Sequence, residues 1–224
     1  MSERRSGIAC IVMASGEGKR FGPQKGGKLL APLGGMPVLR RVLTVLPREK
    51  FCDVVVVTRW PGVEAICDEM LIKCVRHDNP LRSAAIREGM KAVIGGSQDI
   101  PDGCLFVNGD QPLLTAGSVE RLLQTFDEAN GGGAPVVCRL GWKQEAGNPV
   151  LFPSAMFEML CSLEGNRGGA SLLRGEVIQG KGIQNKEIQV LTVEASSPYE
   201  LMDVDSPEDL AKLEAILYFA KIEK

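Results

Sequence analysis

Short runs of β-branched and other apolar residues alternate along this chain with longer stretches whose apolar residues recur at three- and four-residue spacing. Unbroken apolar runs are typical of strands buried on both faces, and the longer spacing is typical of amphipathic helices. Alternation of the two predicts a mostly parallel sheet covered by helices. We therefore expect a three-layer α/β/α fold of Rossmann-like type, with a mostly parallel mixed sheet in the middle layer.

The expected elements can be placed by residue number. Strands are expected at residues 8–13, 54–58, 74–76, 104–107, 135–139, 148–152 and 189–193. Helices are expected at residues 37–46, 63–71, 82–93 and 116–128. A last helix should begin at Ser206, because Ser-Pro-Glu-Asp provides an N-cap, a proline at the first helical position and an acidic residue three places after the cap. With the strand order 3-2-1-4, the first and fourth strands are neighbours.

Length and charge limit the class of protein. The 224 residues, of which 44% are hydrophobic, can fill one core, and we expect a single domain over residues 1–224. The net charge of -2 provides no long-range field that would attract nucleic acid or a membrane surface. The polar start and the short apolar run at residues 8–13 do not fit a signal peptide or a membrane span, so we expect a cytoplasmic protein.

The seven cysteines and one histidine exclude two kinds of site. The cysteines form no C-x-x-C pair, and most lie in apolar segments, which is typical of buried thiols in a reducing compartment. His77 is the single histidine, so the chain has neither a zinc-binding Cys/His pattern nor a histidine-based catalytic triad.

The segment at residues 14–28 follows the first strand and is rich in glycine and basic residues. Glycines let backbone N–H groups approach a polyphosphate, and basic side chains neutralise its charge. We expect a triphosphate-binding loop, with a mobile surface loop as the alternative. A dinucleotide-binding motif would need glycine at Phe21, and a P-loop would need a hydroxyl residue at Leu29, so neither motif fits well.

Asp110 lies in a Gly-Asp-Gln-Pro turn at the end of the fourth expected strand. Ligands of open α/β sheets bind beyond the carboxyl ends of the strands, where the strand order reverses. Asp110 should therefore face the glycine-rich loop, where a carboxylate beside a triphosphate suits Mg²⁺. The alternative is that Asp110 only caps the turn or the next helix.

Asp203 and Asp205 flank a valine just before the last helix. Because side chains alternate between faces at a strand end, we expect only one of the two to face the cleft. Asp203 is the preferred second contact of the metal, and Asp205 would then turn outward or support the helix N-terminus. A purely structural role for Asp203 is the alternative.

Several segments, taken in order, resemble the molybdenum cofactor nucleotidyltransferases, and most closely the molybdenum cofactor cytidylyltransferases among the MobA-like NTP transferases of the glycosyltransferase-A-like superfamily. The matching pieces are MASGEGKRFG at 13–22, KLLAP at 28–32, GDQP at 109–112, GNPVLF at 147–152, GNRG at 165–168 and DVDSPEDL at 203–210. The resemblance implies a nucleotidyltransferase fold and the transfer of CMP from CTP to the phosphate of molybdopterin. It also implies Mg²⁺ as cofactor and pyrophosphate as product.

The resemblance implies roles for particular residues as well. The residues expected to contact the nucleotide are Ala14, Ser15, Gly16, Gly18, Arg20, Lys25, Lys28, Asn79, Arg82 and Ser83. Arg20 and Lys28 are expected to bind its phosphates and to act in catalysis with Asp110, and Asn79, Arg82 and Ser83 are expected to lie against the base. Lys25 fits the family's spacing after the loop glycine, whereas Lys28 fits its Leu-Leu-x-Pro context and is preferred as the phosphate-binding lysine. Asp110 would hold Mg²⁺, and Asp203 or Asp205 would complete the metal site.

Other interpretations keep part of this picture. The same chemistry could use GTP, or a sugar or polyol phosphate as the acceptor. The chain could also be a weakly catalytic accessory protein. Such a protein would bind either the cofactor or the apoenzyme of a molybdenum hydroxylase while that enzyme matures. Two departures from the family favour this last interpretation: the segment at 79–83 is shorter than the family's base-recognition segment, and Asn166 stands where the family often carries aspartate.

Overall fold

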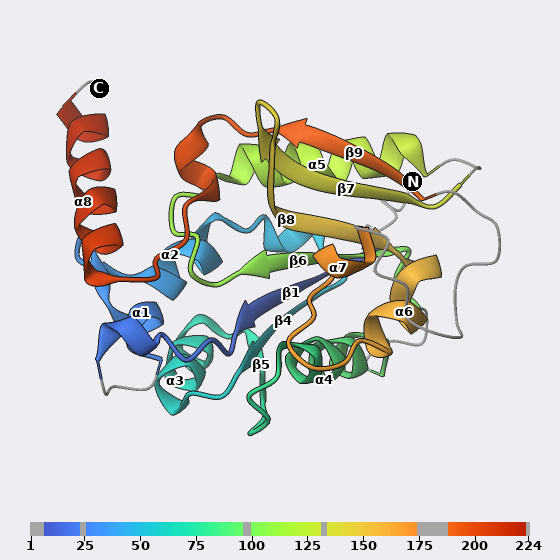
Figure 1. Cartoon of the computed structure of the whole chain (residues 1–224), viewed down its shortest axis with the longest axis horizontal. Coiled ribbons are helices and arrows are strands. Elements are labelled where there is room, and N and C mark those ends of the chain that lie inside the picture. Colours follow the sequence, from blue (N-terminus) through green and yellow to red (C-terminus); the bar gives the residue numbers. More distant parts are fainter. Residues whose placement is uncertain (1–6, 23–25, 96–99, 131–133, 174–187, 223–224) are drawn as a thin grey trace.

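A seven-stranded sheet forms the middle layer of the computed structural model, which describes residues 7–22, 26–95, 100–130, 134–173 and 188–222. The strand order is β5-β4-β1-β6-β8-β7-β9 (Figure 1). The strands are β1 Ile8–Ala14, β4 Asp53–Thr58, β5 Lys73–Arg76, β6 Gly103–Asn108, β7 Val136–Trp142, β8 Glu145–Pro153 and β9 Gln189–Glu194. β8 pairs antiparallel with β6 and β7, and the other neighbours are parallel. The mostly parallel mixed sheet and the predicted order of its first four strands are confirmed.

Helices cover both faces of the sheet. The α-helices are α1 Gly27–Leu30, α2 Val38–Val45, α3 Pro61–Met70, α4 Arg82–Ile94, α5 Ala116–Ala129, α6 Phe157–Cys161, α7 Ala170–Leu173 and α8 Pro207–Ile222. Short 3₁₀ helices are η1 Lys19–Phe21, η2 Arg48–Lys50, η3 Ser154–Met156 and η4 Pro198–Leu201. All the helices predicted from periodicity are confirmed within a few residues. α1 and the small hairpin of β2 Pro32–Leu33 and β3 Met36–Pro37 were not predicted, because they are too short to show a period.

The alternating side chains of β1 build two separate cores. Cys10 and Val12 pack with residues of α2, α3 and α5, whereas Ala9 and Ile11 pack with residues of α4 and α6 on the opposite face. All four side chains are fully buried, and burial of a large aliphatic side chain contributes about 1.5–3 kcal/mol. β1 therefore lies at the centre of the molecule, and the loop that follows it starts from a fixed point.

α8 begins with a reciprocal cap. The Ser206 hydroxyl accepts a hydrogen bond from the backbone N–H of Asp209, and the Asp209 carboxylate accepts one from the backbone N–H of Ser206. The predicted start at Ser206 is confirmed, but Asp209 supports the helix N-terminus rather than Asp205. α8 stands at one end of the molecule (Figure 1) and packs through Leu213 on Leu33 and Val38.

No helix in the described ranges combines the length and the apolar character that crossing a membrane would require.

Candidate functional site

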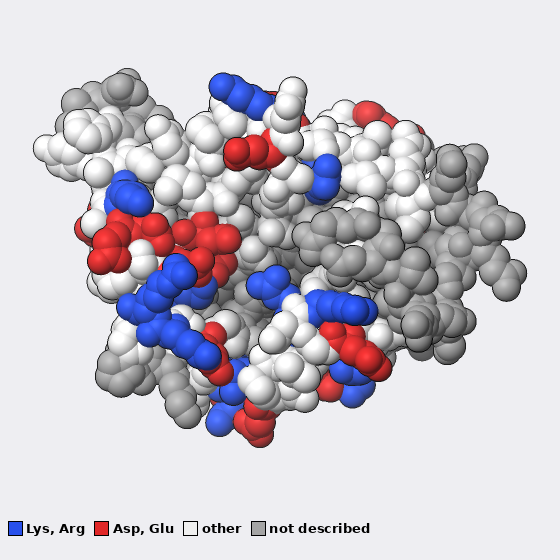
Figure 2. Space-filling model, viewed as in Figure 1, with Lys and Arg blue, Asp and Glu red and all other residues white. Residues whose placement is uncertain are grey.

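A cleft of about 580 Å³ opens at the carboxyl ends of β1 and β6. It is lined by the glycine-rich loop, the start of α4, the ends of β6 and β8, residues 166–170, and the segment before α8. Figure 2 shows acidic and basic side chains side by side around the hollow on this face. The glycine-rich loop and Asp110 therefore face the same cleft, at the place where open α/β sheets bind their ligands.

Lys28 joins two carboxylates in this cleft. Its Nζ donates to Asp110 Oδ2 at 2.5 Å and to Asp205 Oδ1 at 2.9 Å, and the residue is only 7% exposed. Burial alone would lower the pKa of Lys28, but the two carboxylates outweigh it and raise the pKa above its usual value. Lys28 is therefore a charged side chain fixed by two acidic partners.

The backbone of the glycine-rich loop lies directly against the side chain of Lys28. A Cβ atom at Gly18 would lie 3.2 Å from Lys28 Cγ, and one at Gly16 would lie 3.7 Å from its Cε. Gly18 also has a φ of 61°, a left-handed conformation that favours glycine. The absence of side chains at these positions lets loop and lysine share one wall of the cleft.

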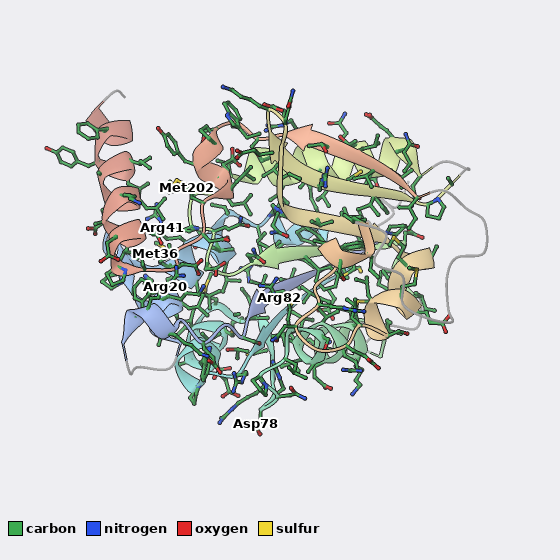
Figure 3. All side chains as sticks on the ribbon, in the orientation of Figure 1. Arg20, Met36, Arg41, Asp78, Arg82 and Met202 are labelled. Carbon is green, nitrogen blue, oxygen red and sulfur yellow. The ribbon has the colours of Figure 1, made fainter. Side chains whose placement is uncertain are left out.

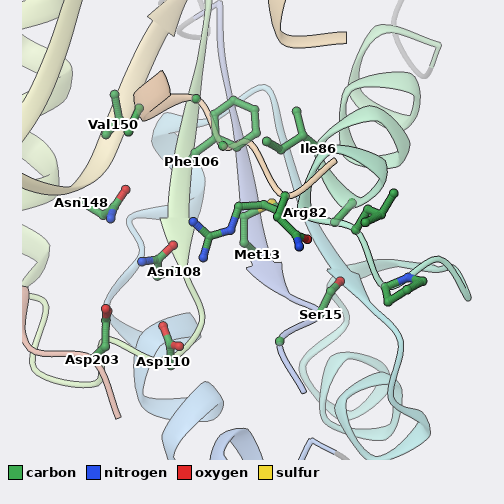
Figure 4. A pocket seen from close by; sticks show the side chains of 18 of the residues that line it. Met13, Ser15, Arg82, Ile86, Phe106, Asn108, Asp110, Asn148, Val150 and Asp203 are labelled. Atoms are coloured by element: carbon green, nitrogen blue, oxygen red, sulfur yellow. The ribbon is translucent and has the colours of Figure 1, made fainter. Parts of the chain in front are cut away.

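Asp203 lies beside Asp110 in the cleft (Figure 4). Its pKa is raised to about 6, first because the cleft walls displace water and then because Asp110 and Asp205 are negatively charged. Lys28 and a side-chain hydrogen bond from Asn108 lower the pKa but do not cancel this effect. Above that pH the site holds three carboxylates and one lysine, so it carries an excess of negative charge.

The segment with Asp203 and Asp205 is fastened to the end of β6. The backbone N–H of Val204 donates to Asp110 O at 2.9 Å, and Val204 itself is fully buried. Both aspartates line the cleft, so the expectation that only one of them faces it is wrong. Residues two apart along an extended segment share a side, and the valine between them takes the core side.

Glu200 fixes the segment that carries Asp203 and Asp205 through hydrogen bonds to Thr115 and Ser196. Its buried carboxylate accepts hydrogen bonds from the backbone N–H and the hydroxyl of Thr115 at 3.1 and 3.0 Å, and from the backbone N–H of Ser196 at 2.8 Å. Gln111 adds a bond from its Nε2 to Leu201 O at 3.2 Å. These contacts hold the two aspartates beside Asp110 across a long stretch of sequence.

The end of β4 supports the glycine-rich loop. Thr58 Oγ1 donates to Ala14 O, and Trp60 Nε1 donates to Gly16 O, each at 2.9 Å. The Trp60 ring also packs on Gly26, where a Cβ atom would lie only 2.7 Å away. Sequence reasoning missed both residues, although the predicted order had placed the second strand next to the first, so that Thr58-Arg59-Trp60 follows a strand end beside the loop.

The structure brings together most of the predicted site residues. Those that line the cleft are Ser15, Gly16, Lys28, Arg82, Asp110, Asp203 and Asp205. Ala14 is buried at the end of β1, and Gly18 packs on Lys28. Lys25 lies outside the described residues.

Three more predicted residues, besides Ala14 and Gly18, are not part of the lining. Arg20 is exposed in η1, and Figure 3 shows it near the base of α8, whereas Arg82 lies in the middle of the molecule. Asn79 is exposed, and its Oδ1 accepts from the backbone N–H of Leu81 at 3.0 Å. Ser83 is buried on the inner side of α4 and is 1% exposed.

The far end of the cleft is apolar. Phe106, Val150, Phe152 and Ile86 line it, and the Phe106 and Phe152 rings meet edge to face at 5.8 Å. In Figure 4, Arg82 reaches from α4 into the space between these side chains and the carboxylates. Within the described ranges, no carboxylate forms an ion pair with Arg82. The cleft thus has a charged end, an apolar end, and one unpaired guanidinium between them.

No ready-made metal site is present in the part of the chain that the structure describes, since no three His, Cys, Asp or Glu side chains are grouped to hold an ion. The Lys28 ammonium group takes a place between Asp110 and Asp205. Among the described residues, Lys28 forms ion pairs with Asp110 and Asp205 but not with Asp203. One or two carboxylates are nevertheless enough for Mg²⁺ when phosphate oxygens and water complete its shell.

Comparison with known families gives one match over most of the chain. Residues 10–183 match the model of the MobA-like NTP transferase domain. The matched range includes the glycine-rich loop, Lys28 and Asp110.

Several curated proteins are similar to parts of the chain. They include the bifunctional protein GlmU of Leifsonia xyli (32% identical over 132 residues, 58% of this chain) and the bifunctional enzyme IspD/IspF of Chelativorans sp. (28% over 136 residues, 57% of this chain). A third is the 3-deoxy-manno-octulosonate cytidylyltransferase of Polynucleobacter asymbioticus (31% over 105 residues, 45% of this chain). The chain spans only 27%, 32% and 39% of the length of these three relatives.

Solved structures share the fold over nearly the whole chain. A nucleotidyl transferase from Methanothermobacter thermautotroptrophicus superposes with a TM-score of 0.72 at 23% identity, covering 95% of this chain and 98% of that one. A Mycobacterium sp. strain JC1 homolog of Rv0371c gives 0.69 at 23% identity, covering 96% and 99%. Rv0371C of Mycobacterium tuberculosis in complex with manganese gives 0.64 at 18% identity, covering 93% and 98%. At these identities the likeness shows the Rossmann-like nucleotidyltransferase fold.

Proposed function

Because the chain belongs to the MobA-like NTP transferase family, an enzyme family of the nucleotidyltransferase type, we propose that it moves CMP from CTP onto the phosphate of molybdopterin and releases pyrophosphate. One observation carries this proposal. The backbone of the glycine-rich loop, the buried Lys28 and three aspartates converge in one cleft at the carboxyl edge of the sheet. That combination of amides, a fixed cation and carboxylates suits a metal-bound triphosphate.

The chemistry requires positioning and charge neutralisation more than proton transfer. The attacking phosphate oxygen of the acceptor is already anionic, so an in-line attack on the α-phosphorus needs no dedicated base. Backbone N–H groups of the loop would hold the β- and γ-phosphates, and Lys28 would offset the negative charge that develops on the α-phosphate. Arg82 lines the cleft without an ionic partner in the described ranges, and we propose that it contacts the nucleotide.

The carboxylates fit a divalent cation. Asp110 and Asp203 lie beside each other, and Asp203 carries unneutralised charge above a pH of about 6. Mg²⁺ bound there would offset charge on the triphosphate and orient its α-phosphate. The manganese complex of the Mycobacterium tuberculosis neighbour supports a divalent cation in this fold.

The choice of CTP and of molybdopterin rests on separate observations. A curated relative named as a cytidylyltransferase supports CTP as the donor. The far end of the cleft, formed by Phe106, Val150, Phe152 and Ile86, suits a flat ring system such as a pterin. A polyhydroxylated sugar would need more hydrogen-bonding partners there.

A sugar-type acceptor is the second candidate. The relative that activates 3-deoxy-manno-octulosonate favours it, and Asn148 and Asn166 provide two polar side chains in the cleft. The two candidates share the charged end of the site and differ only in what occupies the apolar end.

Pyrophosphate release tests these proposals directly. The purified chain is incubated with Mg²⁺ and each of the four NTPs, with and without molybdopterin, in parallel with a sugar phosphate and with 3-deoxy-manno-octulosonate. Release with CTP that depends on the pterin supports the proposal, and release that depends on either sugar acceptor transfers it to the second candidate. Tight pterin binding without release from any pair would instead support an accessory role, with a molybdenum hydroxylase apoenzyme as the partner to test.

A further inference from the structure

Ser15 and His77 form a hydrogen bond across 62 residues of sequence. His77 Nε2 lies 2.8 Å from Ser15 Oγ. The backbone N–H of His77, just after β5, also donates to Thr58 O at 3.0 Å, so its position is fixed by the end of β4. Ser15 lines the cleft, whereas His77 is not part of the lining. His77 would therefore act on a ligand in the cleft only through Ser15.

The direction of this bond follows from the other partner of Ser15. A serine hydroxyl has one proton to donate, and Ser15 Oγ lies 3.0 Å from Val57 O, which can only accept. Ser15 must then accept from His77, which requires a proton on Nε2. His77 Nδ1 is buried and has no hydrogen-bond partner among the described residues. The bond to Ser15 is thus the contact that selects the imidazole tautomer.

The surroundings of His77 favour its neutral form. Its pKa is lowered, mainly because the ring is partly buried and then because Arg59 is positively charged. Glu88, Asp78 and a backbone group of Asn79 act in the opposite direction without reversing the shift.

We propose that His77 is a positioning residue for nucleotide binding, because its Nε2–H holds the Ser15 hydroxyl and through it the backbone of residues 14–16 against the triphosphate. This inference rests on the proposed function of the cleft. Thr58 and Trp60 hold Ala14 O and Gly16 O, and the His77 bond holds the side chain between them. Loss of one such bond should weaken nucleotide binding by about three- to tenfold.

The first test uses the fact that the chain has a single histidine, so every imidazole NMR signal comes from His77. With ¹⁵N-labelled histidine, the full chain should show the tautomer with a proton on Nε2 near neutral pH. Because binding favours neutral His77, saturation with Mg²⁺ and CTP should lower the imidazole titration midpoint further. A proton on Nδ1, or a midpoint that nucleotide leaves unchanged, would overturn the inference.

The second test uses variants. His77→Ala should raise KM for CTP about three- to tenfold with a smaller change in kcat. His77→Gln keeps an amide N–H that can reach Ser15, so it should recover most of the affinity. Unchanged KM in His77→Ala would count against the inference.

A control on the same edge strand separates positioning from general damage to β5. Lys73→Gln removes bonds from Lys73 Nζ to Asp53 and to Ala92 O, both away from the loop, and should leave KM unchanged.

The inference and the proposed function can fail separately, and the experiments distinguish the two cases. If wild type binds no nucleotide, the proposed function fails and the inference falls with it. If wild type binds and turns over CTP, but nucleotide leaves the titration midpoint of His77 unchanged and His77→Ala leaves KM unchanged, the inference alone fails.

Discussion

The ammonium group of Lys28 lies 2.9 Å from the carboxylate of Asp205, which follows it by 177 residues. The same nitrogen lies 2.5 Å from Asp110, so one lysine joins the glycine-rich loop, the end of β6 and the start of α8. In the absence of nucleotide, this contact offsets part of the charge of two carboxylates that would otherwise repel each other. Lys28 therefore has an electrostatic role in the fold as well as a proposed role in phosphate binding.

Replacing Lys28 should affect both roles. Lys28→Met keeps most of the buried length but removes the charge, and kcat/KM should fall at least a hundredfold, as for other groups that stabilise developing negative charge. The melting temperature should also fall, because Asp110 and Asp205 lose their shared cation. Pyrophosphate release and thermal melts measure the two effects, with Lys19→Met as the exposed control in the same loop. Activity within threefold of wild type would contradict the assignment.

Asp203→Asn should separate stability from activity. The folded state raises the pKa of Asp203 to about 6 from its ordinary value of 3.8, so ionised Asp203 opposes folding. Its favourable contribution is complete below a pH of about 3.8 and is lost as the pH rises through 6. The variant should therefore melt at a higher temperature than wild type at pH 8 but not at pH 3.5, and it should be stabilised less by added Mg²⁺. An equal melting temperature at pH 8 would contradict the charge argument.

The sequence predicted the architecture well because the relevant information is local. Unbroken apolar runs such as that of β4 identify buried strands, helical periods identify α4 and α5, and the Ser206 cap identifies the start of α8. The convergence of the loop on Asp110 followed from the strand order alone. A single domain over the whole chain and a cytoplasmic location stay predictions.

The finer geometry of the site depends on contacts between distant residues, which a single sequence does not encode. The pairing of Lys28 with Asp205, the support of Gly16 by Trp60 and the anchoring of Glu200 by Thr115 each join distant segments. Helical spacing alone also does not show which side of α4 each residue occupies. In the structure Ser83 lies on the buried side, whereas Arg82 lines the cleft.

Glu200→Gln should lower both stability and activity, although Glu200 does not line the cleft. The carboxylate of Glu200 accepts from three donors, and an amide in its place would direct N–H groups toward at least one of them. The free energy of unfolding should fall by about 1–3 kcal/mol, the cost of a buried unsatisfied group. Metal-dependent activity should fall too, because the segment with Asp203 loses its anchor. Urea unfolding checks the first effect, and Glu145→Gln, at an exposed position, is the matched control.

Arg82→Gln should change binding without changing the fold. Arg82 is exposed, lines the cleft and forms no ion pair with the described carboxylates, so its replacement should shift the melting temperature little. KM for the nucleotide should rise about tenfold, as expected when a charge-assisted contact of about 1.4 kcal/mol is lost. Arg87→Gln, on the same helix but away from the cleft, should leave KM unchanged. If the KM of the acceptor rises instead while that of CTP does not, Arg82 binds the acceptor phosphate, and the nucleotide must lie closer to the glycine-rich loop than proposed.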